Sequence, residues 1–325
     1  MAINKINLLF VFCLLVISCA TFSPTETINS ESESEAGLHA RFFGTSSIYF
    51  SDGSNHFFID AFLSRPSISK NILNGFKPHP DVFLPLLSES NIHELDAIFV
   101  AHSHYDHVLD APRIAIKTNA TLYGSEQVKS ILAADEEFKA LHSFSQIDVG
   151  RFVVTPISTP HVPKNFFVEL LEKAYMFAGR GCEYITGDQN FSFFIEHPEA
   201  NVLVVPSANY PPSFGKDISA DVVFLGIGLL NNQADMIVDD ETNKTYIETL
   251  WEKAVVATNA RLVIPIHWDN FHNSLDKPLR SPPLQLDDVE DTVKKLRRLA
   301  ARGNRNGESI ALEFAPAKLP FSLRQ

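Results

Sequence analysis

The chain has 325 residues, of which 45% are hydrophobic and 20% charged, so it is long enough for one large core or two modest ones. This composition excludes a globally disordered or collagen-like protein. The formal net charge of -12 argues against a nucleic-acid partner, because phosphate binding needs clustered Lys and Arg, and the one basic run, at 294–298, is typical of the solvated face of a helix.

The N-terminus has the pattern of an export signal. Lys5 precedes an apolar run over 8–17, which is shorter than the ~20 residues that a membrane-spanning helix needs and has the length of a signal-peptide core. The run ends in Val16-Ile17-Ser18-Cys19, which resembles a bacterial lipobox. That resemblance implies cleavage before Cys19 and a lipid on its side chain. We therefore expect a lipoprotein signal peptide over 1–18, with an ordinary secretory signal or a short anchor as the alternative.

The segment after the signal is polar and acidic. Residues 19–37 contain few core-forming side chains, so we expect a flexible tether between the lipid and a domain over 38–325. This arrangement implies the bacterial cell envelope, on the periplasmic side of a membrane. Ala20 stands where Asp signals inner-membrane retention, which favours the outer membrane. With Cys19 lipidated and one cysteine cleaved off, Cys182 has no disulfide partner, and we expect it to be buried and inert.

The domain alternates β-rich runs with helical ones. Asp52-Gly53 is typical of a hairpin turn, and apolar residues from Tyr246 to Val255 recur at helical spacing. A last helix begins after Asp287 or Asp288, either of which can cap it. Strands interspersed with helices predict a layered α/β sandwich. The predicted strands lie at 46–50, 56–60, 96–101, 151–157, 191–196, 201–205, 221–225 and 261–266.

The decisive segment joins a buried strand to a loop rich in potential metal ligands. Residues 99–107 read Phe-Val-Ala-His-Ser-His-Tyr-Asp-His, with three His and one Asp within six positions. Imidazole and carboxylate are the ligands that zinc prefers where thiolates are absent. His102 and His104 are two residues apart and project to one side of an extended chain, whereas the following turn can aim Asp106 and His107 at a second position. The pattern therefore favours two adjacent metals.

His-x-His-x-Asp-His after an apolar strand resembles the signature motif of the metallo-β-lactamase superfamily. The resemblance runs from about Phe42 to about Pro283 and implies a four-layer αββα sandwich with the metals at one sheet edge. It also implies that His161 and His267, each after a predicted strand, complete the two sites. The implied ligands are His102, His104 and His161 for the first metal and Asp106, His107 and His267 for the second.

The bridging ligand departs from the pattern of the family, which normally supplies an Asp between the two metals, often within Gly-Asp-Thr-Gly. Asp188 matches letter by letter within Thr186-Gly187-Asp188-Gln189, but it precedes the predicted hairpin. Ser207 follows the second strand of that hairpin and occupies the slot by topology. We expect the bridge to be absent, with Asp188 as the alternative, and a missing carboxylate weakens binding of the second metal.

Two further residues are candidates for supporting roles. Asp60 ends a predicted strand, and we expect it to hold a ligand histidine by its second ring nitrogen, with a simple turn role as the alternative. His272 follows His267 closely and is a candidate for the pocket lining. The remaining histidines are ordinary surface or loop residues.

The resemblance implies a zinc-dependent hydrolase that uses one or two ions, with other divalent metals able to replace zinc. A metal-activated hydroxide then attacks an ester, lactone or phosphodiester bond, and Asp106 orients the water. Residues 264–271 resemble the branch with the ascorbate-6-phosphate lactonases and the N-acylphosphatidylethanolamine phospholipase D enzymes, so the expected substrate is a small molecule or a lipid-derived ester. The alternatives are a non-catalytic envelope protein that keeps the fold for binding, and a redox site with iron. The sequence leaves the oligomeric state open.

Overall fold

The computed structural model describes residues 21–31, 37–132, 137–161, 189–215, 218–239, 241–284, 286–303 and 307–324. The predicted signal peptide, Cys19, Cys182 and Asp188 lie outside these residues. Within them, no helix is both long enough and apolar enough to cross a bilayer.

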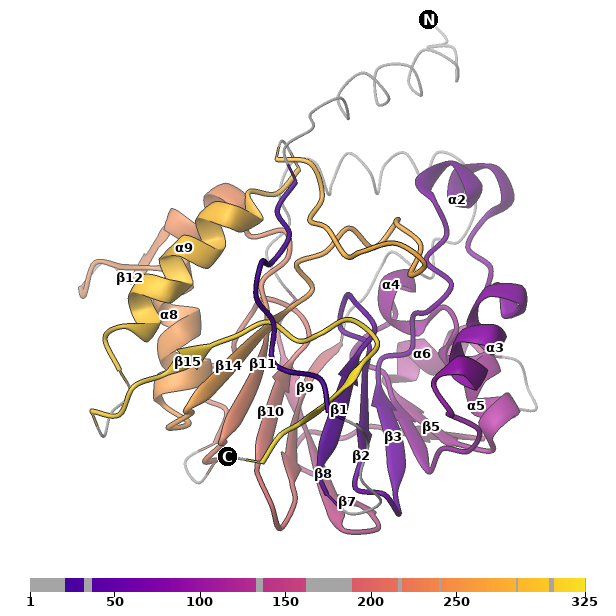
Figure 1. The fold of residues 1–325 in the computed structure, drawn as a ribbon. Helices are drawn as coiled ribbons and strands as arrows, with labels where there is room; N and C mark the ends of the chain where they lie inside the picture. The colour runs from indigo at the N-terminus through magenta and orange to yellow at the C-terminus, as the bar shows by residue number, and fades with distance from the viewer. Residues whose placement is uncertain are drawn as a thin grey trace, which may run out of the picture.

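Two large mixed sheets face each other, and helices cover the outer side of each (Figure 1). The first sheet has the strand order β16 (Pro320–Ser322), β1 (His39–Phe42), β2 (Ile48–Ser51), β3 (His56–Ile59), β4 (Ala97–Phe99), β5 (Thr121–Gly124) and β6 (Phe138–Ala140). The second has the order β15 (Ala311–Leu312), β14 (Leu262–Ile266), β11 (Val222–Gly226), β10 (Val202–Val205), β9 (Asn190–Glu196), β8 (Phe152–Thr159) and β7 (Ile147–Val149). This architecture confirms the predicted αββα sandwich.

The helices fill the connections between strands. The last one begins where predicted, because the Asp288 side chain accepts a hydrogen bond from the backbone N–H of Asp291 at 3.0 Å. The helical stripe after Tyr246 ends in a π-turn, in which the N–H of Ala257 donates to the carbonyl of Glu252. The described helical elements are α2 (Ile68–Asn74), α3 (Pro80–Glu89), α4 (Tyr105–Val108), α5 (Ala111–Thr118), α6 (Glu126–Ile131), the 3-10 turn Asn231–Asp235, α8 (Tyr246–Trp251), the π-turn Glu252–Val256 and α9 (Val289–Ala300), and a small hairpin pairs β12 (Ile237–Asp239) with β13 (Lys244–Thr245).

Aromatic side chains fill the space between the two sheets. Phe57 of the first sheet packs edge-on against Phe152 of the second, with ring centroids 5.0 Å apart. Phe50 contacts Phe224 across the same layer at 5.7 Å. Burying a Phe side chain contributes about 1.5–3 kcal/mol, and a well-oriented aromatic pair about 0.5–1.5 kcal/mol more, so these rings stabilise the approach of the sheets.

The parallel strands determine which residues meet at one edge. In the first sheet β3, β4, β5 and β6 run parallel, and in the second β10, β11 and β14 do. Because carboxyl ends of parallel strands share an edge, the residues that follow them are brought together. Asp60 follows β3, His102 follows β4 through Val100-Ala101, Ser207 follows β10 and His267 follows β14.

The described part of the predicted tether differs from the expectation of a flexible segment, because residues 21–31 lie against the domain. Phe22 packs on Phe314 with ring centroids 5.6 Å apart, and the N–H of Ile28 donates to the carbonyl of Phe314. At its end, the N–H of Glu31 donates to the carbonyl of Pro320. The reason is local: Phe22 and Ile28 supply apolar surface within an otherwise polar stretch, and burying it offsets the entropy lost on ordering.

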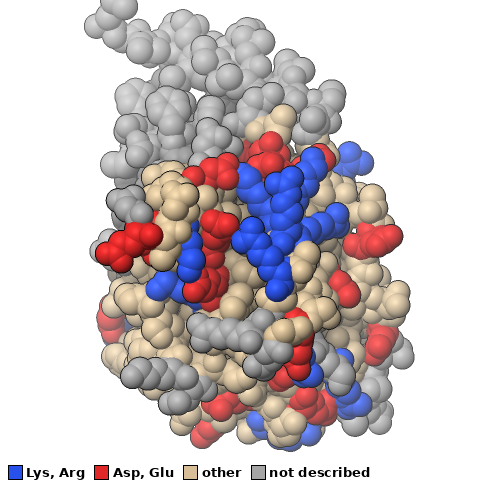
Figure 2. All heavy atoms as spheres, turned by 90° about the vertical axis from the view of Figure 1, so that its left-hand side faces the viewer, with Lys and Arg blue, Asp and Glu red and all other residues tan. Residues whose placement is uncertain are grey.

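Figure 2 shows the face of the molecule on which α9 lies, where Lys and Arg side chains gather beside acidic ones. Lys294 pairs with Glu290 at 2.8 Å, and Lys295 with Asp235 and Asp291 at 2.6 Å. Val293 and Leu296 lie on the opposite, buried side of the helix. The basic run at 294–298 is therefore the solvated face that the sequence predicts.

Candidate metal centre

The structure brings the six predicted ligand side chains together in two groups of three. The ligand atoms of His102, His104 and His161 all lie within 4.8 Å of one another, and the same is true of Asp106, His107 and His267. The two groups adjoin, because the rings of His102 and His107 have centroids only 3.9 Å apart. Three separate parts of the chain contribute: the loop after β4, the end of β8 and the end of β14.

The first group consists of imidazoles that face a common point. Its ring centroids are separated by 4.5 Å for His102 and His104, 4.9 Å for His102 and His161, and 4.6 Å for His104 and His161. Asn209 fixes the backbone of His161, because its side-chain amide donates to the His161 carbonyl. This bond links the end of β8 to the loop after β10.

The second group centres on the carboxylate of Asp106. His267 Nε2 lies 3.2 Å and His107 Nε2 lies 3.7 Å from the same oxygen, Asp106 Oδ2. Asp106 and His107 are both on α4, a single helical turn that starts directly after His104. The turn changes the direction of the chain after His104, so Asp106 and His107 form a second group directly beside the first, and one short loop serves both.

Asp60 has the supporting role that the sequence suggests. His107 Nδ1 lies 2.6 Å from Asp60 Oδ2, so the imidazole donates there and keeps Nε2 for a cation. The other carboxylate oxygen accepts from the backbone N–H of Ala101 at 2.8 Å. Asp60 is fully buried, and it thereby connects the end of β3 to the loop that carries His102 and His104.

A buried polar loop between β1 and β2 was missed by the sequence analysis. Ser46 Oγ donates to Asp60 Oδ2 at 2.6 Å and lies 2.9 Å from His107 Nδ1. Thr45 accepts a hydrogen bond from the backbone N–H of His267 through its carbonyl and donates its own N–H to Asp269 Oδ1 at 2.7 Å. Small hydroxyl residues after a strand are common in turns, so nothing in the sequence marks these two as parts of the site.

A buried ion pair braces the loop after His267. Arg65 donates through Nη2 to Asp269 Oδ2, and both side chains are fully buried. Gly44 makes room for this pair, since a Cβ there would lie 2.5 Å from Arg65 Nη1, and its φ of +86° suits glycine. An Arg and an Asp that are 204 residues apart give no signal in the sequence that they will pair.

Four residues of the site have strained backbone conformations. Thr45, Asp60, Arg65 and His267 adopt left-handed φ values of 53°, 48°, 47° and 57°. This conformation is uncommon outside glycine and costs most for a β-branched residue such as Thr45. Such strain persists only where surrounding contacts impose it, and here these contacts are the hydrogen bonds of the Thr45 loop and the Arg65–Asp269 pair.

The electrostatics and the unpaired ring nitrogens of the cluster fit a cation. His102 is buried, and neither of its ring nitrogens has a hydrogen-bond partner among the described residues. Burial, and then the neighbouring imidazoles, lower the pKa of His102 well below its usual range, which keeps it in the neutral form that binds metals. Burial alone would raise the pKa of Asp106, but His107 and His267 lower it far below its usual range, so this carboxylate stays ionised.

Ser207 occupies the topological slot that the sequence analysis assigned to it. It follows β10, the second strand of the β9–β10 hairpin, and β11 then pairs in parallel with β10. Among the described residues, no carboxylate joins the two groups of ligands. Asp188, the alternative bridge, lies outside the described residues.

His272 is close to the second group, as the sequence suggested. Its Nδ1 lies 3.2 Å from the carbonyl of Pro66, which only accepts, so Nδ1 carries the proton. Its Nε2 then accepts from the hydroxyl of Tyr105 at 3.2 Å. Burial lowers the pKa of His272 to about 4, so the ring is neutral near pH 7.

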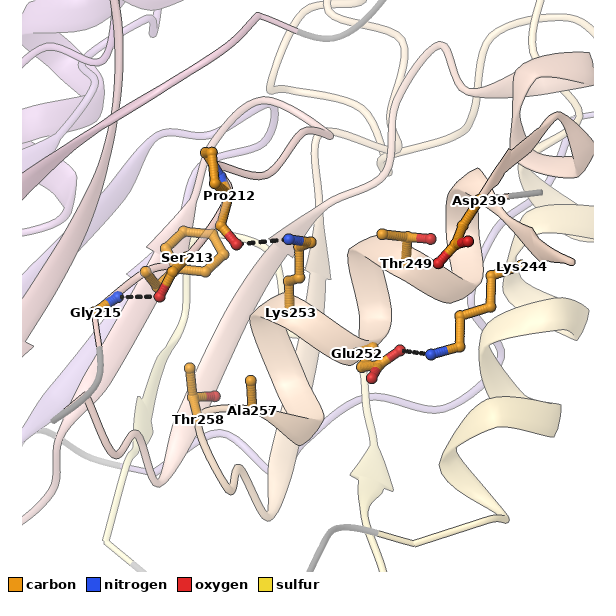
Figure 3. Close-up of a pocket in the computed structure, with 11 residues that line it drawn as sticks. Pro212, Ser213, Gly215, Asp239, Lys244, Thr249, Glu252, Lys253, Ala257 and Thr258 are labelled. Atoms are coloured by element: carbon orange, nitrogen blue, oxygen red, sulfur yellow. Dashed lines mark hydrogen bonds and ion pairs between the residues drawn. The ribbon is translucent and has the colours of Figure 1, made fainter. Parts of the chain in front are cut away.

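A separate pocket of about 480 Å³ lies beside α8, lined by the loop at 212–215 and the π-turn (Figure 3). Lys253 donates to the carbonyl of Pro212 at 2.6 Å, and Lys244 forms an ion pair with Glu252. None of the six predicted ligands lines this pocket. We assign this pocket no role in the metal centre.

The sequence matches the family described as the Beta-lactamase superfamily domain over residues 55–268. The chain belongs to this superfamily. The fold family implies a divalent metal, and the donor set described above fits one. A comparison with curated proteins gives no match.

Several solved structures are similar to this chain at low sequence identity. The diiron β-hydroxylase CmlA from Streptomyces venezuelae is 14% identical with a TM-score of 0.53, and the match covers 90% of this chain and 55% of CmlA. YhfI from Bacillus subtilis, a metallo-β-lactamase fold protein, is 16% identical over 91% of this chain and 97% of its own, with a TM-score of 0.46. The isothiocyanate hydrolase from Delia radicum gut bacteria is 13% identical over 88% and 99%, with a TM-score of 0.48.

Proposed function

We propose that this protein is a zinc-dependent hydrolase that cleaves an ester, lactone or phosphodiester bond. The observation that carries the proposal is the pair of adjacent ligand groups at one edge of the sandwich, built from five imidazoles and one ionised carboxylate. In the proposed assignment, His102, His104 and His161 hold the first ion, and Asp106, His107 and His267 hold the second. A bound zinc ion lowers the pKa of water and polarises the bond under attack.

Zinc is the proposed metal because imidazole-rich, thiolate-free sites with a carboxylate suit it. The same donors also suit iron, and CmlA, which shares the fold, is described as diiron. Elemental analysis of protein purified without added metal separates the two. A zinc content of one to two ions per chain supports the proposal, whereas iron in equal stoichiometry favours redox chemistry.

The chain's own groups support hydrolysis in two ways. Asp106 is ionised and lies between His107 and His267, so in the proposed function its carboxylate orients the attacking water by accepting a hydrogen bond. Asp60 and Ser46 hold His107 in one orientation, so the site is organised before a substrate arrives. For the substrate we propose a small or lipid-derived ester, in keeping with a lipoprotein held on the periplasmic side of a membrane.

The test uses His104→Ala and a matched control. We expect His104→Ala to lose the first metal and at least about 100-fold in turnover of ester, lactone and phosphodiester substrates, because catalytic groups of this kind contribute on that order. His142→Ala changes an exposed histidine outside both groups and should leave metal content and turnover unchanged. Unchanged turnover in His104→Ala would show that the assigned site is not the catalytic one.

The competing function is a non-catalytic envelope protein that keeps the fold for binding. Ser207, which stands where the family places a bridging Asp, is the observation in its favour. That function predicts a folded protein with little bound metal and no turnover across the substrate panel. Zinc retained through purification, together with turnover that chelation abolishes, would exclude it.

A further inference from the structure

The N-terminal segment is fastened to the loop that follows His267. The N–H of Phe22 donates to Ser281 Oγ at 2.8 Å, and the N–H of Ser281 donates back to the carbonyl of Phe22 at 2.9 Å. The ring of Phe22 packs edge-on against Trp268, with centroids 5.9 Å apart. Trp268 directly follows the predicted ligand His267, so Phe22 fixes the chain at the end of β14 from which His267 projects.

The proposed lipid attachment site is only three residues before this contact. A fully extended chain spans at most about 3.6 Å per residue, so Cys19 lies within about 11 Å of Phe22. A lipid on Cys19 therefore cannot leave the domain free to turn on a long tether. The side of the domain that carries Phe22 and the loop at 270–284 must stay close to the bilayer surface.

The metal centre lies on that same side. Figure 1 shows the start of the described chain and the orange loop that follows β14 meeting above one end of the two sheets, the end at which β4 and β14 finish. The loop exposes Lys277 and Arg280, against a single exposed acid, Asp276. Leu284 on this loop is 44% exposed. The loop has a net charge of +1, although the segment packed against it exposes Glu26, and its exposed Leu is suited to contact with a bilayer.

We infer that the metal-bearing edge faces the membrane and that the substrate is an ester or phosphodiester of a bilayer-resident amphiphile. The inference rests on the proposed hydrolase function and on the proposed lipid at Cys19. What it adds is the orientation of the domain. Because Phe22 contacts Ser281 and Trp268, a lipid on Cys19 holds the metal centre towards the membrane.

The two tryptophans of the chain allow the orientation to be measured. Trp268 directly follows β14 at the membrane-facing edge, whereas Trp251 ends α8, from which the chain runs on to the start of β14, at the other end of that strand. Lipidated Trp251→Phe and Trp268→Phe proteins are bound to phosphatidylethanolamine–phosphatidylglycerol vesicles that contain a dansyl-labelled lipid. We expect severalfold more energy transfer to dansyl from Trp268 than from Trp251. Equal transfer, or more from Trp251, would overturn the orientation.

A linker insertion tests the consequence for the substrate. Ten Gly/Ser residues between Ala20 and Thr21 add about 17 Å of flexible reach while leaving the Phe22 contacts in place. We expect turnover of a vesicle-embedded ester to fall severalfold and turnover of a water-soluble ester to stay unchanged. Equal turnover of the embedded ester by both proteins would overturn the inference.

The outcomes separate this inference from the proposals beneath it. Mass spectrometry that shows an unmodified Cys19 in membrane-extracted protein would remove the inference, but turnover of the soluble ester would leave the hydrolase function standing. Conversely, loss of all turnover in both proteins would remove the hydrolase function, whereas the energy-transfer difference would still report the orientation. A Cys19→Ser protein that no longer sediments with vesicles is the expected control.

Discussion

His107 Nδ1 and Asp60 Oδ2 lie 2.6 Å apart, at the meeting point of three loops. Burial by itself would lower the pKa of His107, but Asp60, and then Asp106, raise it above its ordinary value. The imidazole is thus held firmly by its carboxylate partner, with Nε2 directed towards Asp106. The contact links the ends of β3 and β4 to the second group of ligands.

Asp60→Asn should weaken the second metal site selectively. The amide keeps the shape of the carboxylate but loses its charge, and such changes around a ligand histidine cost about 10–100-fold in metal affinity. Calorimetric titration of apo-protein with zinc measures both sites. Asp52→Asn, at a residue that is equally buried but pairs with Arg151, is the control and should leave both affinities unchanged. Equal losses in the two variants would contradict the role of Asp60.

Gly228→Ala should displace His267. A Cβ at this position would lie 2.0 Å from the His267 carbonyl oxygen and 2.6 Å from its Nδ1, so the ring or its backbone must move. We expect the second metal to be lost while the first is retained, as read by zinc stoichiometry. Gly307→Ala is the control: its added Cβ meets nothing within 4 Å, and its φ of +76° strains the backbone away from the ligands, so it should keep both metals. Full zinc content in Gly228→Ala would contradict the expectation that close packing of Gly228 on His267 is needed for the second metal.

Breaking the Arg65–Asp269 pair should destabilise the whole domain. Asp269→Asn leaves a buried guanidinium without its counter-charge, and removing one partner of such a pair costs about 3–5 kcal/mol of unfolding free energy. Replacing both, as Arg65→Met with Asp269→Asn, should cost clearly less than the sum of the same two single changes. Urea unfolding of the four proteins gives the coupling energy, and strict additivity would count against the pair.

Ser207→Asp should strengthen binding of the second metal. If Ser207 stands in the slot of the bridging carboxylate, restoring the charge adds a shared ligand and a negative charge between the two groups. We expect the weaker of the two zinc affinities to rise by about 10-fold or more, an amount similar to that of other supporting carboxylates. Ser207→Asn has the same size without the charge and should not reproduce the gain. No difference between Asp and Asn would show that the slot lies elsewhere.

His272 should make stability depend on pH between about 4 and 6.5. Burial lowers the pKa of its folded form to about 4 from an ordinary 6.5, so in this window the unfolded chain binds a proton that the native protein does not. Stability from this group is therefore complete above pH 6.5 and is lost as pH falls towards 4, by at most about 3 kcal/mol. His272→Gln should flatten this part of the profile. Unfolding free energies at pH 4.5 and 7.5 that change equally in both proteins would refute the assignment.

The elements predicted correctly are those specified by nearby residues. The apolar run before His102 forms β4, the hairpin at 191–205 forms β9 and β10, and Asp288 caps α9 through a residue three positions away. Three of the unpredicted strands, β6, β7 and β15, are two or three residues long, too short to show a hydrophobic period. The contacts of residues 21–31 were missed for a similar reason, because two apolar side chains among polar ones do not alter the composition.

By itself, the sequence determined the identity and spacing of the candidate metal ligands, the sandwich class and the choice of Ser207 for the topological bridging slot, because these depend on residue types along short stretches. Only the tertiary structure decided that Thr45, Ser46, Arg65 and Asp269 hold those ligands, and that Phe22 meets Trp268. Such partners lie tens to hundreds of residues apart and are buried polar or aromatic groups whose pairing arises when the two sheets close. These contacts form only when that edge of the sandwich is assembled, so no local sequence pattern predicts them.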